Sequence, residues 1–137
     1  MRHLLRTLAV FVGTAGGATG VARAQATHEI RMEADDKRGE YRFVPARVSA
    51  RPGDLLVFRT VSGAPHSVIF EAAGLSEDAH EAMNGAMSRR SADLSSPLLT
   101  RNGVEYRITV PALAKGTYAF FCLPHRAYDM RGELTVR

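Results

Sequence analysis

The residues with the clearest capacity for chemistry are a cysteine, a histidine and a methionine near the C-terminus. Cys122, His125 and Met130 form the pattern C-x-x-H-x-x-x-x-M directly after the aromatic stretch 118–121. A thiolate and an imidazole are good ligands for copper and zinc, and a thioether is a weaker, soft ligand. The pattern therefore predicts a transition-metal site that takes most of its ligands from one loop.

A fourth donor must come from elsewhere in the chain, and His66 is the candidate. It follows Pro65 and opens the largely apolar stretch 67–70. Two imidazoles, one thiolate and a weak axial thioether are the ligand set of a blue-copper electron-transfer centre. We therefore predict that one copper ion per chain is bound by His66, Cys122, His125 and Met130.

Other interpretations of these residue types need to be weighed. Cys122 could be a small buried hydrophobic residue, or a nucleophile with a nearby histidine as its base. No third orienting residue or oxyanion-hole motif accompanies it, which argues against the nucleophile. A helical stripe of His80, Met83 and Met87 could bind a second copper ion, but methionines at that spacing more often seal a helix against a core.

The predicted ligands need a rigid scaffold, and the sequence indicates how one positions the thiol. Strand alternation places Tyr118, Phe120 and Cys122 on the same face, so the thiol ends a row of inward side chains. Pro124 favours an extended conformation at Leu123 and helps to turn the chain. The histidine that follows is thereby expected to return beside the thiol.

The rest of the chain has the pattern of an all-β fold, a Greek-key β-sandwich of about eight strands. Short stretches of alternating apolar and polar residues are separated by turn signals such as Arg51–Asp54. The predicted strands are His28–Ala34, Tyr41–Val44, Arg47–Ala50, Asp54–Thr60, His66–Phe70, Val104–Val110, Thr117–Cys122 and Glu133–Arg137.

One segment interrupts this pattern of strands. Residues 76–90 are predicted to form a short helix that is capped by Ser76, with acidic residues in its first turn and Arg89 and Arg90 at its end. Residues 91–102 are polar and rich in turn residues. We therefore expect one helix-and-loop excursion from the sandwich.

The N-terminal residues 1–26 have the layout of a secretory signal peptide. Basic residues precede the apolar run 8–21, and cleavage is predicted after Ala24 or Ala26, where small residues stand. The run is short and interrupted by glycines, so stable membrane insertion is not expected. Residues 27–137 would then form a single domain that is periplasmic or secreted.

Composition excludes some classes of partner. The predicted leader contains three of the 18 basic residues and none of the 14 acidic ones, so the remaining chain is close to neutral. No basic stripe typical of nucleic-acid binding is present. The single cysteine is more informative, because exported proteins usually pair their cysteines. A lone cysteine in an exported domain favours a chemical role.

Several segments match the sequence pattern of a known family, and they cover most of residues 27–137. They are Phe43–Pro45, the Arg51–Asp54 turn into Leu56–Phe58, Pro65–Val68, Gly116–Tyr118, Cys122–His125 and Met130–Val136. With these segments the chain resembles the cupredoxin family, in particular plastocyanin, pseudoazurin and related small bacterial copper-binding proteins. The resemblance implies an eight-stranded Greek-key sandwich with His66, Cys122 and His125 as in-plane ligands and Met130 as the axial one.

The same resemblance implies a place where redox partners bind. In the family the second histidine ligand reaches the surface through an apolar patch, which here would surround His125. Arg126 and Arg131 would give this patch a positive rim, so we expect a cytochrome or copper enzyme with an acidic docking face as partner.

One residue departs from the family pattern. Relatives usually carry glycine immediately before the axial methionine, and this chain has Asp129. A carboxylate there, if it were neither solvated nor paired with Arg126 or Arg131, would favour Cu(II) and lower the reduction potential.

The predicted function is a monomeric electron carrier that transforms no substrate. Only four histidines remain outside the leader, too few for the additional copper centres of multicopper enzymes. The alternative is a periplasmic copper chaperone or storage protein that uses the same ligands for metal transfer.

Overall fold

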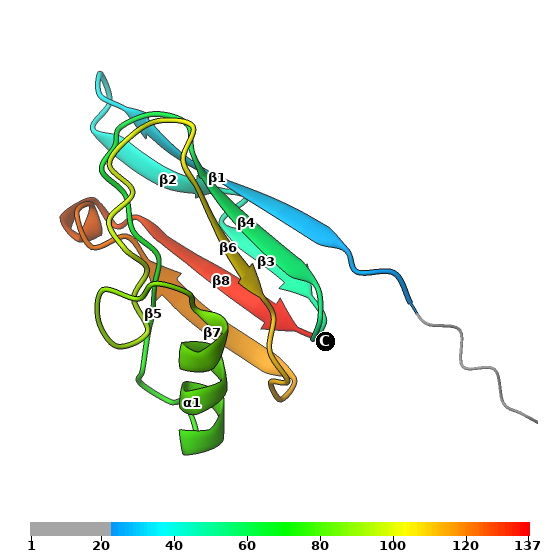
Figure 1. Cartoon of the computed structure of the whole chain (residues 1–137). Coiled ribbons are helices and arrows are strands. Elements are labelled where there is room, and N and C mark those ends of the chain that lie inside the picture. The colour runs from blue at the N-terminus through cyan, green and yellow to red at the C-terminus, as the bar shows by residue number, and fades with distance from the viewer. Residues whose placement is uncertain (1–22) are drawn as a thin grey trace, which may run out of the picture.

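The fold is a sandwich of two four-stranded β-sheets with one short helix beside it, as seen in a computed structural model that describes residues 23–137 (Figure 1). The strands and the helix are β1 (Thr27–Asp35), β2 (Glu40–Val44), β3 (Arg47–Ala50), β4 (Leu55–Thr60), β5 (Ile69–Phe70), α1 (Glu77–Ala86), β6 (Glu105–Thr109), β7 (Gly116–Phe121) and β8 (Arg131–Val136). The predicted all-β sandwich of about eight strands with one helical excursion is confirmed.

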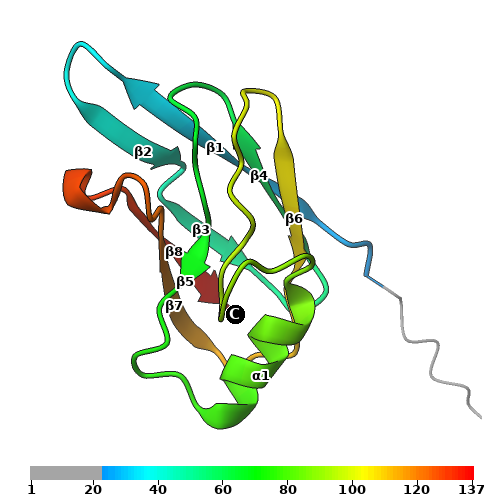
Figure 2. The ribbon, with the colours of Figure 1, turned by 60° about the vertical axis from the view of Figure 1, so that its left-hand side comes forward.

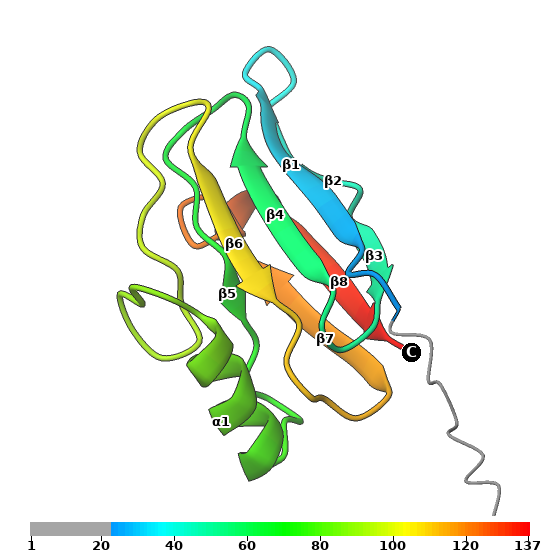
Figure 3. The same cartoon turned by 45° about the vertical axis from the view of Figure 1, so that its right-hand side comes forward.

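The strand order explains how distant parts of the sequence meet. One sheet has the order β2-β1-β4-β6 and the other the order β3-β8-β7-β5. The chain passes from the first sheet to the second between β2 and β3, and the β1–β4 and β3–β8 pairs are parallel. The two sheets face each other across the core (Figure 3). The loop after β4, from one sheet, and the loop after β7, from the other, therefore meet at one end of the sandwich.

The core between the sheets forms because each strand turns alternate side chains inward. In β4, Leu56 and Phe58 are fully buried, as the period of two requires. Phe43, Phe58 and Phe120 meet edge to face with ring centroids 4.9–6.2 Å apart, an arrangement that aromatic quadrupoles favour. This aromatic cluster joins both sheets, and its member Phe120 precedes Cys122 by two residues.

Gly132 on β8 is required by this cluster. It lies opposite Phe120 on β7, and a Cβ atom at Gly132 would meet the Phe120 ring at 2.4 Å. The absence of a side chain on β8 is therefore what lets the Phe120 ring lie over that strand.

Helix α1 lies beside the sheets (Figure 2). The Oγ of Ser76 accepts a hydrogen bond from the Ala79 N–H, which confirms the predicted cap. Met83 and Met87 are buried in the core, whereas His80 lies at the surface against Asp93. The two methionines therefore pack this segment against the core and do not face the same way as His80.

The predicted end of the helix was wrong. It ends at Ala86, and its last turn contains no basic residue. Arg89 has a positive φ of 49°, which a continuing helix does not allow, and the Arg90 side chain donates to the Asn84 side chain instead. The arginines thus shape the loop after the helix.

The predicted strand His66–Phe70 is also shorter in the structure, where only Ile69 and Phe70 pair with β7. His66 forms an isolated bridge with Leu99, and the Val68 N–H donates to the Ser96 side chain. The loop that follows α1 therefore replaces a neighbouring strand along this segment, which sequence alternation does not reveal.

The first 22 residues of the predicted signal peptide lie outside the described residues. The described part of the chain contains no helix that has both the length and the hydrophobicity to cross a bilayer.

Substitution of Gly132 by alanine is expected to destabilise the fold by about 1–3 kcal/mol, because the new methyl group overpacks the Phe120 ring. Gly85→Ala is the matched control, since its Cβ would meet nothing within 4 Å on α1, and it is expected to stabilise by about 0.5–1 kcal/mol. Denaturant unfolding of the two variants measures both effects. Equal stabilities for the two variants would contradict this role of Gly132.

Candidate metal centre

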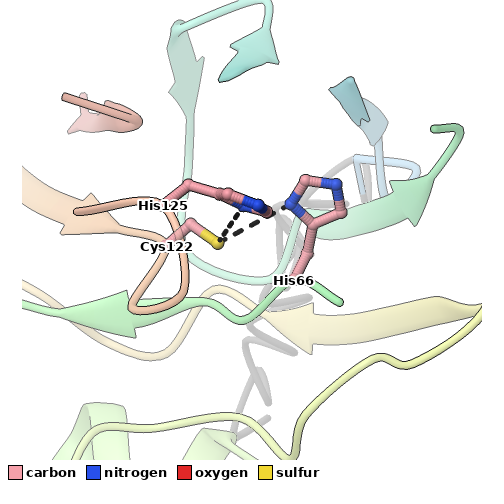
Figure 4. Close-up of side chains that lie close together, drawn as sticks. All are labelled: His66, Cys122 and His125. Atoms are coloured by element: carbon pink, nitrogen blue, oxygen red, sulfur yellow. Dashed lines mark hydrogen bonds between the residues drawn. The ribbon is translucent and has the colours of Figure 1, made fainter. Parts of the chain in front are cut away.

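Three of the predicted ligands meet at one end of the sandwich. Figure 4 shows His66 from the loop after β4 facing Cys122 and His125 from the loop after β7. The Cys122 Sγ lies 3.6 Å from the His66 Nδ1 and 3.5 Å from the His125 Nδ1, and all three donor atoms lie within 4.8 Å of one another. Residues 56 positions apart in the sequence thus form one cluster.

Cys122 occupies the first position after β7, and its surroundings fix both its backbone and its sulfur. Its N–H donates to the Met130 carbonyl at 3.0 Å, and the Ser67 N–H donates to Sγ at 3.4 Å. The side chain is completely buried. Burial raises the pKa of the Cys122 thiol, so the metal-free site holds a neutral S–H at neutral pH.

The loop from Cys122 to Met130 turns through a short 3-10 helix, Arg126–Tyr128. The Met130 N–H donates back to the His125 carbonyl at 3.3 Å, which closes the second half of the loop on itself. Asp129 closes the turn with φ 58° and ψ 35°, the left-handed conformation. Glycine adopts this conformation most readily and aspartate tolerates it better than most residues.

Asp129 is also paired, so the condition for its predicted effect on copper is not met. Its carboxylate is 87% exposed and lies 2.9 Å from the Arg131 guanidinium. Arg131 contacts Glu71 as well. The charge of Asp129 is therefore offset by solvent and by Arg131.

His66 is oriented by a hydrogen bond on its far side. Its Nε2 donates to the Ser62 carbonyl at 2.7 Å, which leaves Nδ1 free to face Cys122. Its backbone exchanges two hydrogen bonds with Leu99, at 2.8 and 3.0 Å. The ring is fully buried, and burial lowers the pKa of His66 from its usual value.

His125 lies closer to the surface than the other two donors. Its exposed fraction is 8%, and its ring stacks on Tyr41 with centroids 3.9 Å apart and an interplanar angle of 11°. Burial is the larger cause, and the nearby His66 the smaller, of a lowered pKa for His125. Both imidazoles are therefore neutral near pH 7, the form in which a nitrogen lone pair can bind a metal.

Met130, the fourth predicted ligand, is fully buried and belongs to the same apolar cluster as Cys122. The hydrogen bond between its carbonyl and the Cys122 N–H places the two residues side by side across the loop.

Several supporting residues were not singled out by sequence reasoning. The sequence places Ser67 only within the segment Pro65–Val68, yet its N–H donates to the Cys122 sulfur and its Oγ accepts from the Leu123 N–H. Ser62 and Tyr41 carry no motif at all. Only the three-dimensional structure brings them to the histidines.

The chemistry of this donor set fits copper. A buried thiol and two neutral imidazoles offer one soft and two borderline ligands, and no carboxylate belongs to the cluster within the described residues. A hard cation such as Mg²⁺ or Ca²⁺, which prefers oxygen ligands, does not fit.

Comparisons with known proteins agree with this chemistry. Residues 29–137 match the family model described as copper binding proteins, plastocyanin/azurin family. The chain is 32% identical over 109 residues to plastocyanin from Rumex obtusifolius, covering 80% of this chain and 99% of that protein. It is 33% identical over 125 residues to chloroplastic plastocyanin from Pisum sativum, covering 91% of this chain and 67% of that protein.

Solved structures share the fold. Oxidised plastocyanin from Dryopteris crassirhizoma superimposes with a TM-score of 0.62 at 24% identity, covering 80% of this chain and all of that one. A pseudoazurin from Methylobacterium extorquens gives a TM-score of 0.52 at 24% identity, covering 80% of this chain and 74% of that one.

The lowered pKa values of His66 and His125 predict that the metal-free protein loses stability in mild acid. Below about pH 6.5 the unfolded chain takes up protons that the buried rings resist, so the free energy of unfolding falls as the pH falls from there toward the folded-state pKa values. Urea unfolding between pH 7.5 and 5.5 measures this slope. The slope is expected to be smaller in His66→Gln, and an unchanged slope would contradict the assignment.

Proposed function

This chain belongs to the plastocyanin/azurin family of copper-binding proteins, and from that premise we propose that it is a mobile one-electron carrier outside the cytoplasm. The observation that carries the proposal is the dry cluster of one thiol and two imidazoles held by a rigid sandwich. We propose that His66, Cys122, His125 and Met130 would hold one copper ion, with Met130 as the weaker ligand. Copper bound there would supply a centre that alternates between Cu(I) and Cu(II).

The protein's own contribution is to hold its donors in place and neutral before the metal arrives. The Ser62 carbonyl fixes the His66 ring, and the Ser67 N–H points at the Cys122 sulfur. Binding then requires the loss of one proton, from the Cys122 Sγ, because a thiolate is the ligand. A scaffold that does not rearrange keeps the barrier to electron transfer low.

The alternative function, a copper chaperone or storage protein, has less support. Metal transfer to another protein requires ligands that a partner can reach and displace. His66 and Cys122 are completely buried, and only an edge of His125 reaches solvent. Such a site slows the release of copper, a step that a chaperone and a storage protein both need.

The structure also argues against a hydrolytic or thiol-transfer enzyme. A nucleophilic cysteine needs a lowered pKa and access to substrate. The Cys122 thiol has a raised pKa and no exposed surface. We therefore propose that the protein is not an enzyme.

We further propose that residues 1–26 are a secretory signal peptide and that 27–137 form the single copper-binding domain. The basic start and apolar run support export. The family match begins at residue 29, which is consistent with a domain boundary at that point.

A redox partner is proposed to dock over His125. Leu123 and Tyr128, more than half exposed, belong to the same loop, and Leu98 is exposed on the neighbouring loop. Arg126 lies on the same loop and brings a positive charge, and its guanidinium packs 4.7 Å from the centre of the Phe121 ring. Arg131, predicted to join the rim, is instead engaged by Glu71 and Asp129.

Addition of Cu(II) to residues 27–137 is expected to produce an intense thiolate-to-copper absorption band in the visible region at one equivalent. Cys122→Ser should abolish the band because an alcohol is not a thiolate, whereas Met130→Leu should keep it and raise the reduction potential by loss of the axial ligand. Absence of the band in the unsubstituted protein would reject the electron-carrier proposal and favour the chaperone.

Electron transfer to an anionic oxidant is expected to depend on Arg126. With hexacyanoferrate(III) and the Cu(I) protein, Arg126→Gln should lower the rate roughly threefold at low ionic strength and flatten its salt dependence. Arg51→Gln is the control, because Arg51 lies in a turn at the opposite end of the sandwich. Equal effects of the two substitutions would exclude a local role of Arg126 at the docking surface.

A further inference from the structure

The β1–β2 hairpin reaches both histidines of the cluster through one pair of opposed residues. Ala34 on β1 and Tyr41 on β2 are direct partners in the antiparallel register. Side chains of directly opposed residues lie on the same face of a sheet. Ala34 and Tyr41 each belong to a chain of contacts that ends on a different imidazole.

The first chain of contacts runs from Ala34 to His66. The Ala34 N–H donates to the Ser62 Oγ at 2.9 Å, and the same hydroxyl donates to the Ala34 carbonyl at 3.1 Å. The Ser62 carbonyl in turn accepts from the His66 Nε2 at 2.7 Å. The Ser62 side chain therefore fixes, against β1, the carbonyl that orients His66.

The glycine after Ser62 makes this approach possible. Gly63 has a φ of +68°, and a Cβ there would lie 2.0 Å from the Ala34 Cβ. The loop after β4 is thus pressed onto β1 as closely as a backbone without side chain allows. A loop held this tightly leaves the Ser62 carbonyl little freedom to move.

The second chain of contacts is a single stacked pair, Tyr41 on His125. The rings are nearly parallel, with centroids 3.9 Å apart, and the Tyr128 ring also packs against Tyr41, with centroids 4.7 Å apart. His125 belongs to a loop rather than a strand. The stack is therefore a contact between this loop ring and the other sheet.

We propose that the Ala34–Tyr41 pair is one positioning device for both imidazoles, with Ser62 and Tyr41 as the positioning residues that act through it. The proposal rests on the proposed function, because its purpose is to preset the two histidines for copper. The rings that it holds are 4.9 Å apart and inclined at 56°. The contacts from Ala34 to His66 and from Tyr41 to His125 start from one cross-strand pair. A displacement of either imidazole is therefore transmitted through that pair to the other.

A merely structural role makes different predictions. If Tyr41 served only to cover apolar surface, leucine would replace it with little effect on the histidines. If Ser62 only closed a turn, its loss would lower stability and leave the ring of His66 in place. The two roles are separated by observing the rings themselves.

The test is NMR of the metal-free domain together with copper affinity measured by competition with a chelator. Tyr41→Leu and Ser62→Ala are each expected to lower Cu(II) affinity about 10-fold, the lower end of the effect of groups that orient metal ligands. In the metal-free protein, Tyr41→Leu should also accelerate hydrogen exchange of the Ala34 amide, and Ser62→Ala should weaken the NOEs between the Tyr41 and His125 rings.

Two matched variants complete the design. Tyr41→Phe retains the ring and should keep copper affinity within about twofold and the exchange of Ala34 unchanged. Ser49→Ala, on the exposed side of β3, should change neither readout. Thermal unfolding confirms that the variants are folded at the temperature of the NMR measurements.

The outcomes distinguish the proposed positioning of the histidines from the proposed electron-carrier function. If Tyr41→Leu leaves the Ala34 amide protected, or if Tyr41→Phe is as damaging as Tyr41→Leu, the shared positioning device is refuted. The NMR readouts need no copper and decide this by themselves. Failure of the unsubstituted domain to bind copper at all would instead refute the proposed function.

Discussion

The hydrogen bond from the Cys122 N–H to the Met130 carbonyl is the contact on which the site depends. It continues the β7–β8 pairing by one step beyond Phe121 and Arg131 and so forces the residues between into a loop. A loop closed at that point returns His125 to the thiol and buries Met130. The strands beneath cannot slip without exchanging the faces of every side chain, because the period of a strand is two. The register of one strand pair thus fixes three of the four proposed ligands.

Burial imposes a second constraint, which explains why the metal-free cluster is compatible with a stable fold. Three ionised groups in a dry site would cost far more than the fold could offset. Burial instead shifts the pKa of each group toward its neutral form: upward for Cys122, downward for both histidines. The fold therefore stores the donors uncharged, and the formation of the thiolate is coupled to the arrival of a cation.

The clustering of His66, Cys122 and His125 and the strands could be predicted from sequence because both leave local signals. Alternation located every strand to within a few residues, and the spacing of Cys122, His125 and Met130 identified the loop. The supporting contacts leave no such signal. Tyr41 is an ordinary strand residue until the two sheets pack, and the His66 segment pairs with a loop after α1 instead of a strand. Likewise, the helix ends at Ala86 because Met87 is extended, with φ −90° and ψ 110°, a conformation that its residue type does not indicate.

Asp129 shows how local geometry and electrostatics limit one another at this site. Its left-handed conformation explains why glycine suits the position before the buried methionine, and why an aspartate can replace it at moderate cost. The replacement also introduces a negative charge next to a site whose donors are kept neutral. Because the backbone turn directs the carboxylate outward to solvent and Arg131, that charge is largely screened before it reaches the buried sulfur. The same pairing engages the Arg131 guanidinium with two carboxylates, Asp129 and Glu71, so Arg131 offers less positive charge to a partner than the sequence predicts.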